Sequence, residues 1–169
     1  MTVLRRVAVA SSMAWALLLP LAPFAASQPA PAPVWYALAF VVYGAGSVVC
    51  HQLPERSFFL GPAQWPVCAR CAGIYVGAAL AALWWLGSGF SRTRATAPPK
   101  RLSTRSMLAA AAAPTAATLL YEWTTGDMPS HAVRALTGAP LGAAIVFVVV
   151  GALSGASAGR TPTGPPNVN

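Results

Sequence analysis

The sequence predicts an all-α, polytopic helical membrane protein of about five spans. Hydrophobic residues make up 56% of the 169 residues and charged residues only 8%, whereas roughly a quarter of a soluble domain is charged. Five apolar segments approach the ~20 residues that a membrane-spanning helix needs. A soluble fold with so few polar residues would expose large apolar patches, but a helix satisfies its own backbone groups in lipid. We therefore expect a multi-pass protein of the cell membrane, with the lipid bilayer as its partner.

The predicted spans follow the apolar runs along the chain. They lie near residues 7–26, 34–50, 67–86, 107–122 and 131–153. The last four would form a membrane module over residues 34–153. Residues 1–33 precede it as a hydrophobic segment with a Pro-rich connector, and residues 154–169, rich in Gly, Ser, Pro and Thr, predict a disordered tail.

The first apolar segment has two interpretations. Arg5 and Arg6, an apolar run and the small residues at 25–27 are typical of a cleaved secretory signal. The apolar run, however, reaches about 20 residues, which is long for a signal core and sufficient for a span. We favour a retained helix.

The order of the spans places two polar loops on the same face of the membrane. Loop 51–66 joins the second and third spans, loop 123–130 joins the fourth and fifth, and two crossings separate them. All three acids, all three cysteines and both histidines of the chain lie within residues 50–71 and 122–131. Groups able to ligate, titrate or attack are therefore expected on one face only.

Basic residues indicate which face this is. Residues 87–106 hold five of the eleven basic residues and no acid, which is typical of a cytoplasmic loop. The Cys/His face would then be extracytoplasmic, although Arg5 and Arg6 argue the opposite if the first segment spans. The basic loop lacks the interleaved aromatic residues of a nucleic-acid-binding surface, so we expect no nucleic-acid partner.

Four of the five cysteine and histidine residues lie in a stretch of 22 residues. Cys50 and His51 end the second span, and the C-x-x-C motif of Cys68 and Cys71 begins the third. Pro66 predicts a helix start just before them, which would place both thiols in the first turns, on one face. The helix dipole and the neighbouring Arg70 would favour a thiolate there.

Three interpretations of this cluster stay open. In the first, Cys50, Cys68 and Cys71, together with His51 or His131, bind zinc or iron. In the second, the C-x-x-C motif performs thiol–disulfide exchange in a membrane oxidoreductase. In the third, the cysteines pack as small hydrophobic residues in a structural or assembly subunit. Whether the protein is an enzyme is not decided by its sequence, which contains no phosphate-binding loop, dinucleotide fingerprint or nucleophile elbow.

Charged neighbours would support the site or contact a substrate. An arginine at the centre of a span costs about 2.5–3.5 kcal/mol, so Arg134 should pair with Asp127 or Glu122. The acids and bases expected around the cluster, as supporting or substrate-binding groups, are Glu55, Arg56, Arg70, Asp127 and Arg134.

Three pairs of glycines at four-residue spacing predict close helix packing, within the chain or in a homo-oligomer. They begin at Gly73, Gly138 and Gly151.

Two runs of the sequence resemble the predicted membrane proteins grouped as domain of unknown function 2085. They are Cys-His-Gln-x-Pro-Glu-Arg-Ser-Phe from Cys50 and Pro-Val-Cys-Ala-Arg-Cys-Ala-Gly-Ile-Tyr-x-Gly from Pro66. The similarity is strong over residues 47–77, with Ala72 where the family usually has Thr. It is looser over residues 126–142, through Asp127, Arg134, Thr137, Gly138 and Gly142. The resemblance implies a compact helical membrane module with a Cys/His/Arg cluster, and it implies no particular reaction.

Overall fold

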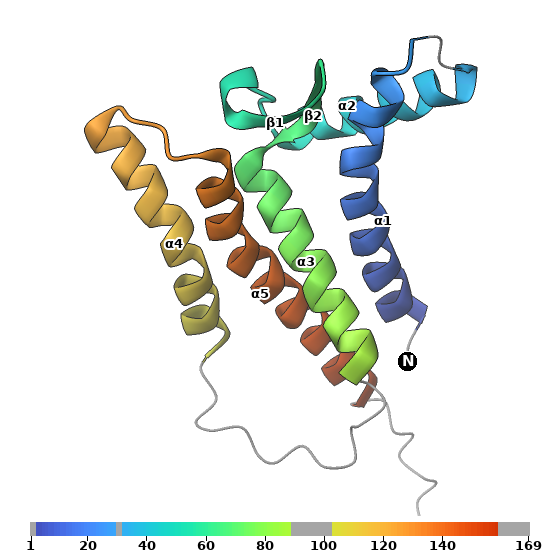
Figure 1. The fold of residues 1–169 in the computed structure, drawn as a ribbon. Helices are drawn as coiled ribbons and strands as arrows, with labels where there is room; N and C mark the ends of the chain where they lie inside the picture. Colours follow the sequence, from blue (N-terminus) through green and yellow to red (C-terminus); the bar gives the residue numbers. More distant parts are fainter. Residues whose placement is uncertain (1–2, 30–31, 89–102, 159–169) are drawn as a thin grey trace, which may run out of the picture.

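The computed structural model describes residues 3–29, 32–88 and 103–158 (Figure 1). Within them the chain forms five α-helices and one two-stranded β-hairpin, preceded by a short 3-10 turn. The elements are α1 (Val3–Ala26), α2 (Pro33–Val49), the turn Pro54–Arg56, β1 (Ser57–Leu60), β2 (Ala63–Cys68), α3 (Ala69–Ser88), α4 (Thr104–Thr125) and α5 (His131–Ala158). The all-α membrane fold that composition predicts is therefore present. Most of the basic loop and the last eleven residues, for which a cytoplasmic loop and a disordered tail were predicted, lie outside the described residues; α5 continues helical through residues 154–158.

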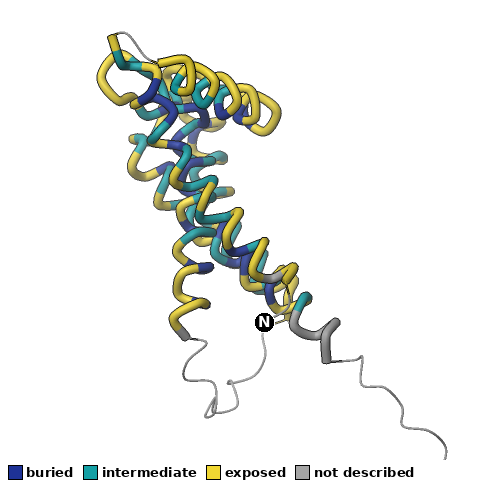
Figure 2. The backbone as a smooth tube through the Cα atoms, turned by 90° about the vertical axis from the view of Figure 1, so that its right-hand side faces the viewer, coloured by how far each residue is buried: buried dark blue, intermediate teal, exposed yellow. Residues whose placement is uncertain are grey.

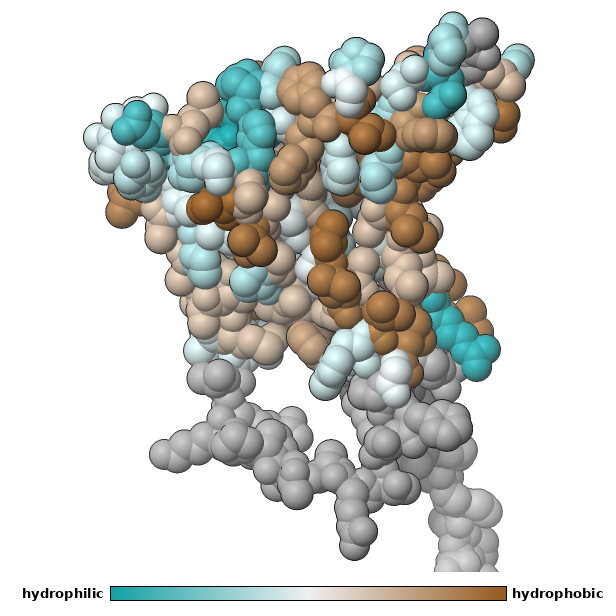
Figure 3. Space-filling view, viewed as in Figure 1, coloured by the Kyte–Doolittle hydropathy of each residue, from teal (hydrophilic) through white to brown (hydrophobic). Residues whose placement is uncertain are grey.

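Three of the helices are long and apolar enough to cross a membrane. They are α1, α3 and α5, over Arg6–Ala26, Ala69–Gly87 and His131–Leu153. The alanine-rich α4 runs beside α5 (Figure 1). In Figure 3, apolar and weakly polar side chains cover the middle of the visible face, and hydrophilic ones gather mainly at the hairpin end, with a further patch at the opposite end. This distribution fits a bundle whose middle meets lipid.

The second predicted span differs from the expectation, because α2 lies across the ends of the other helices (Figure 1). It has 17 residues and extends about 26 Å, which is less than the ~30 Å of a hydrocarbon core. Since α2 does not run along the bundle, the start of α1 lies at the same end as the start of α4. Arg6 lies near the start of α1, and the basic loop precedes α4, so both indicate the same end of the bundle as the cytoplasmic one. The opposite orientations that these two groups of basic residues indicated in the sequence are thereby reconciled.

Helices α3 and α5 pack backbone against backbone at their glycines. A Cβ atom added at Gly73 or Gly77 would collide with the backbone of α5, and one added at Gly142 would collide with the backbone oxygen of Ile74 in α3. Two of the predicted small-residue faces are thus used within the chain. Gly151, in the third, has open space around its Cα atom.

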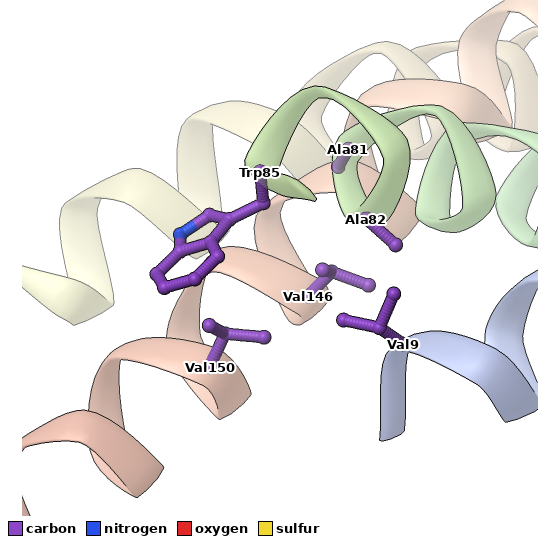
Figure 4. Close-up of a cluster of buried hydrophobic side chains, with 6 residues drawn as sticks. All are labelled: Val9, Ala81, Ala82, Trp85, Val146 and Val150. Carbon is purple, nitrogen blue, oxygen red and sulfur yellow. The ribbon is translucent and has the colours of Figure 1, made fainter. Parts of the chain in front are cut away.

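Two apolar clusters hold the bundle together. At the end far from the hairpin, Trp85 of α3 covers Val146 and Val150 of α5, and Val9 of α1 faces them (Figure 4). The second cluster lies under the hairpin and contains Leu19. Figure 2 shows buried positions mixed with exposed ones along the helices, so that much of each helix is left to meet lipid.

The hairpin is an element that the sequence interpretation missed, because it treated residues 51–66 only as a polar loop. Strands β1 and β2 are antiparallel, with Leu60 opposite Ala63, and Gly61 takes a φ of 59° in the turn between them. Pro66 lies inside β2 and not in the first turn of a helix, so that expectation was wrong. Helix α3 begins at Ala69, directly after Cys68.

Candidate functional site

Three cysteine sulfurs converge at the hairpin end of the bundle. The Sγ atoms of Cys50, Cys68 and Cys71 all lie within 4.8 Å of one another. Cys50 follows the last residue of α2, Cys68 ends β2, and Cys71 is in the first turn of α3. All three are free thiols. Three structural elements thus deliver one sulfur each to a common point.

Hydrogen bonds fold Cys50 onto the start of α3. The Cys68 backbone N–H donates to the Cys50 sulfur over 3.2 Å, and the Cys50 N–H caps α2 by donating to the carbonyl of Gly46 over 2.9 Å. A Cβ atom at Gly46 would collide with the carbonyl oxygen of Pro66. Only glycine therefore allows α2 to approach β2 this closely.

Gln52 locks the corner that follows Cys50. Its φ of 51° is in the left-handed region, where residues other than glycine are uncommon. Its side-chain amide donates to the carbonyls of Tyr43 and Pro66, over 2.9 and 2.7 Å, and its own carbonyl accepts from Gln64 over 2.6 Å. Backbone strain of this kind clusters at functional sites, held by the surrounding structure.

The base of the cluster is apolar and includes the first helix. Leu19 of α1, Val67 and Ala72 are buried around Cys50. Ala72, which replaces the Thr usual in the family that the chain resembles, lies in this packing with 2% exposure. A small apolar residue fits there without an unpaired hydroxyl.

The surroundings of Cys68 favour the charged form of its thiol. Its pKa is lowered to about 5, first by a hydrogen bond from the Cys71 thiol and further by the backbone N–H groups of Cys71 and Arg70, although burial opposes the shift. These N–H groups belong to the first turn of α3, where the helix dipole favours negative charge. The site therefore favours the thiolate of Cys68, the form that binds metals and attacks disulfides.

An open cavity of about 330 Å³ lies against the cluster. Its lining comprises the three cysteines together with Val49, His51, Gln52, Leu53 and Arg56. The side chain of His51 is exposed and lies outside the three-sulfur group. The sulfurs are therefore buried on their helical side and reachable from the cavity.

His131 joins the two polar loops and lies outside the three-sulfur group. Its Nε2 atom lies 3.1 Å from the backbone oxygen of Glu55, and its ring meets that of Phe58 edge-on, with 5.6 Å between the centroids. The structure thus brings loops 51–66 and 123–130 to the same end of the bundle, as the order of the spans predicted.

A buried ion-pair network ties α3, α4 and α5 together below the thiols. Glu122 accepts from Arg134 Nε and Nη2 over 3.0 and 2.7 Å, and from Arg70 Nη2 over 2.7 Å. Arg134 is 2% exposed and Glu122 is 8% exposed. Of the two partners predicted for Arg134, the structure selects Glu122, whereas Asp127 is exposed beyond the end of α4.

Arg70 was expected to act on the thiolates, but the structure turns its guanidinium to α4. It also donates to Thr118 Oγ1 over 3.3 Å. Glu55 and Arg56 form a loose exposed pair, with 4.0 Å between Oε1 and Nε.

Sequence reasoning overlooked the residues whose hydrogen bonds and close contacts hold the elements of the site together, namely Tyr43, Gly46, Gln52, Ser57 and Gln64. The aromatic and apolar runs on either side of Gly61-Pro62 were a hairpin signal, and a hairpin would have placed Gln64 opposite Phe59.

Comparison with known proteins identifies the family. The family described as "Predicted membrane protein (DUF2085)" matches residues 50–148. The chain belongs to this family. The match begins at Cys50 and includes every residue of the thiol cluster, the hairpin and the ion-pair network, whereas α1 and α2 precede it.

Two archaeal relatives share short stretches of this sequence. An uncharacterized protein of Methanocaldococcus jannaschii is 42% identical over 57 residues, covering 34% of this chain and 36% of its own length. An uncharacterized protein of Methanothermobacter thermautotrophicus is 53% identical over 30 residues, covering 18% of this chain and 27% of its own length. The chain thus spans about a third of the length of these relatives. No solved structure matches it significantly.

Proposed function

We propose that this membrane protein binds one zinc or iron ion through the thiolates of Cys50, Cys68 and Cys71. The observation that carries the proposal is the convergence of three sulfurs from three separate elements within 4.8 Å. Zn–S bonds of about 2.3 Å in tetrahedral geometry place sulfurs about 3.8 Å apart, so the cluster needs little adjustment to close on an ion. Packing alone does not require three sulfurs to meet at one cavity.

The fourth coordination position would face the cavity, because all three cysteines line it. His51 shares that lining and is a candidate fourth ligand after a side-chain rotation. A site with three protein ligands and one open position is the usual arrangement of a catalytic or exchangeable zinc. His131 has a different part in this proposal, because its bond to Glu55 holds the two loops together.

Elemental analysis of the detergent-purified protein tests the proposal. We expect about one zinc or iron per wild-type chain, and loss of that metal in Cys68→Ser and in Cys71→Ser. His131→Gln is the matched control, because it removes a candidate ligand that lies outside the sulfur group and should keep the metal. A folded wild-type protein free of both metals would overturn the proposal.

Thiol–disulfide exchange is the second candidate function, favoured by the lowered pKa of Cys68 within a C-x-x-C motif. It predicts a reducible bridge between Cys68 and Cys71, which alkylation before and after reduction, followed by mass measurement, would detect. Thiols that stay free under oxidising conditions would exclude it.

The hairpin end is the extracytoplasmic end in this proposal. Of the eleven basic residues, only Arg56, Arg70 and Arg134 belong to that end, where three acids balance them. Arg5, Arg6 and Arg105 lie in the first turns of α1 and α4, at the opposite end, and the remaining five fall in the sequence between α3 and α4 or after α5. This asymmetry favours a cytoplasmic location for the opposite end.

A further inference from the structure

The cavity beside the thiols carries one cation and no carboxylate in its lining. Arg56 is the arginine among the eight residues that line it. Its Nε atom is enclosed and donates no hydrogen bond to any of the described residues. The nearest acid, Glu55, is 4.0 Å away and half exposed, so it neutralises the guanidinium only weakly. Cys68, whose thiolate form is favoured, shares this lining, but no hydrogen bond joins it to Arg56 among the described residues. The guanidinium therefore keeps donors free for an anion.

The wall that presents Arg56 is firmly held. Ser57, the next residue, is fully buried; its hydroxyl donates to the carbonyl of Leu53 over 2.8 Å and accepts from Gln64 over 3.1 Å. The 3-10 turn Pro54–Arg56 closes with a bond from the Arg56 N–H to the carbonyl of Leu53. The backbone that carries Arg56 therefore does not have to be ordered when its guanidinium binds an anion.

We propose that this cavity binds a small anionic ligand, a carboxylate or a phosphate-type group, whose charge is recognised by Arg56. The planar donors of a guanidinium match both groups. At about 330 Å³ the cavity is at the small end of ligand pockets, and Val49 and Leu53 offer an apolar wall for the remainder of the ligand. Contact of the anion with a metal at the fourth position rests on the function proposed above, whereas its recognition by Arg56 does not.

A pair of alkylating reagents tests the charge preference directly. Iodoacetate is an anion and iodoacetamide is its neutral counterpart. The ratio of their alkylation rates at the cavity cysteines therefore reports the local electrostatic potential in the cavity. The measurement uses the full-length protein in detergent with a chelator present, and mass spectrometry reads each cysteine. We expect Arg56→Gln to lower the iodoacetate-to-iodoacetamide ratio about 5- to 10-fold.

Two further variants control the experiment. Arg56→Lys keeps the charge and should retain most of the ratio, while Arg105→Gln, at an exposed position in the first turn of α4, should leave it unchanged. Circular dichroism checks that each variant is folded. An unchanged ratio in a folded Arg56→Gln protein would overturn the proposal.

Protection of the wild-type thiols serves as a second measurement and separates two sources of the anion. If glycerol phosphate in solution slows the reaction with iodoacetamide, the ligand is a soluble anion. If nanodiscs of phosphatidylglycerol slow it relative to phosphatidylcholine, and glycerol phosphate does not, the ligand is a lipid headgroup. Protection by neither overturns the proposal. Metal content is measured separately, so a metal-free protein with the charge preference contradicts only the metal function.

Discussion

The Nε2 atom of His131 lies 3.1 Å from the backbone oxygen of Glu55, although 76 positions separate the two residues. This contact joins the loop before the hairpin to the first residue of α5. It places the end of α5 that carries Arg134 close to the hairpin. The thiol cluster and the ion-pair network are consequently built at the same end of the bundle, and α3 contributes Cys71 to the first and Arg70 to the second.

Replacing Glu122 should destabilise the protein strongly. Glu122→Gln would leave two largely buried guanidinium groups without their counter-charge, and breaking a buried pair typically costs about 3–5 kcal/mol. Thermal unfolding in detergent would show the loss as a large fall in Tm. Glu55→Gln removes an acid whose side chain is 50% exposed and should change the Tm very little. Equal effects of the two substitutions would contradict the role assigned to Glu122.

The glycine contact between α3 and α5 predicts a sharp difference between two substitutions in one helix. Gly142→Ala would drive a methyl group into the backbone of Ile74 and should lower the Tm. Gly151→Ala has open space and should be neutral or stabilising, by up to about 1 kcal/mol. Thermal unfolding of both variants compares them directly. A tolerated Gly142→Ala would mean that α3 and α5 are not packed this closely.

The acidity of Cys68 predicts an unusual pH profile for its alkylation. Because its pKa is lowered to about 5, the rate with iodoacetamide should stay nearly constant from pH 7 to pH 9 and fall only as the pH approaches about 5. The folded state favours the thiolate, so its contribution to stability is present above the usual thiol pKa and is lost as the pH falls through about 5. Mass spectrometry of metal-free protein gives the rate at this cysteine.

Cys71→Ala provides the comparison for that profile. Alanine has no donor to replace the hydrogen bond from the Cys71 thiol, which is the largest cause of the lowered pKa of Cys68, so the profile of Cys68 should move to higher pH. An alkylation rate that rises tenfold per pH unit up to pH 8 in the wild type would show that Cys68 is an ordinary thiol.

Membrane orientation predicts opposite labelling of two exposed positions. Asp127→Cys lies at the hairpin end and Thr104→Cys at the start of α4, at the other end. A membrane-impermeant maleimide applied to intact cells should label the first and not the second. The wild type gives the background from the native cysteines. The reverse result would place the thiol cluster in the cytoplasm.

Much of this arrangement was predictable because hydrophobic length sets the helices of a membrane protein. The five helices, the shared location of the two polar loops and the pairing of Arg134 with an acid near the end of α4 all follow from segment lengths and charge positions. Those features depend on the order of residues along the chain, and little on the packing around them.

The remaining features depend on contacts that the sequence does not display. Helix α2 is as apolar as a span, so composition gives no sign that it lies crosswise; only its 17-residue length and the hairpin after it favour that position. Arg70 follows a cysteine in the sequence, yet its side chain leaves α3 toward Glu122. Which way such a side chain points is decided by the neighbouring helix.

The close approach of α2 to β2 at Gly46 has a consequence for how an ion would enter and leave. The corner beyond Cys50 is fixed by main-chain contacts and by the amide of Gln52, so the fold itself holds the three donor atoms together. If the site binds an ion as proposed, uptake and release would require no refolding, and their rates would be set by diffusion through the mouth of the cavity.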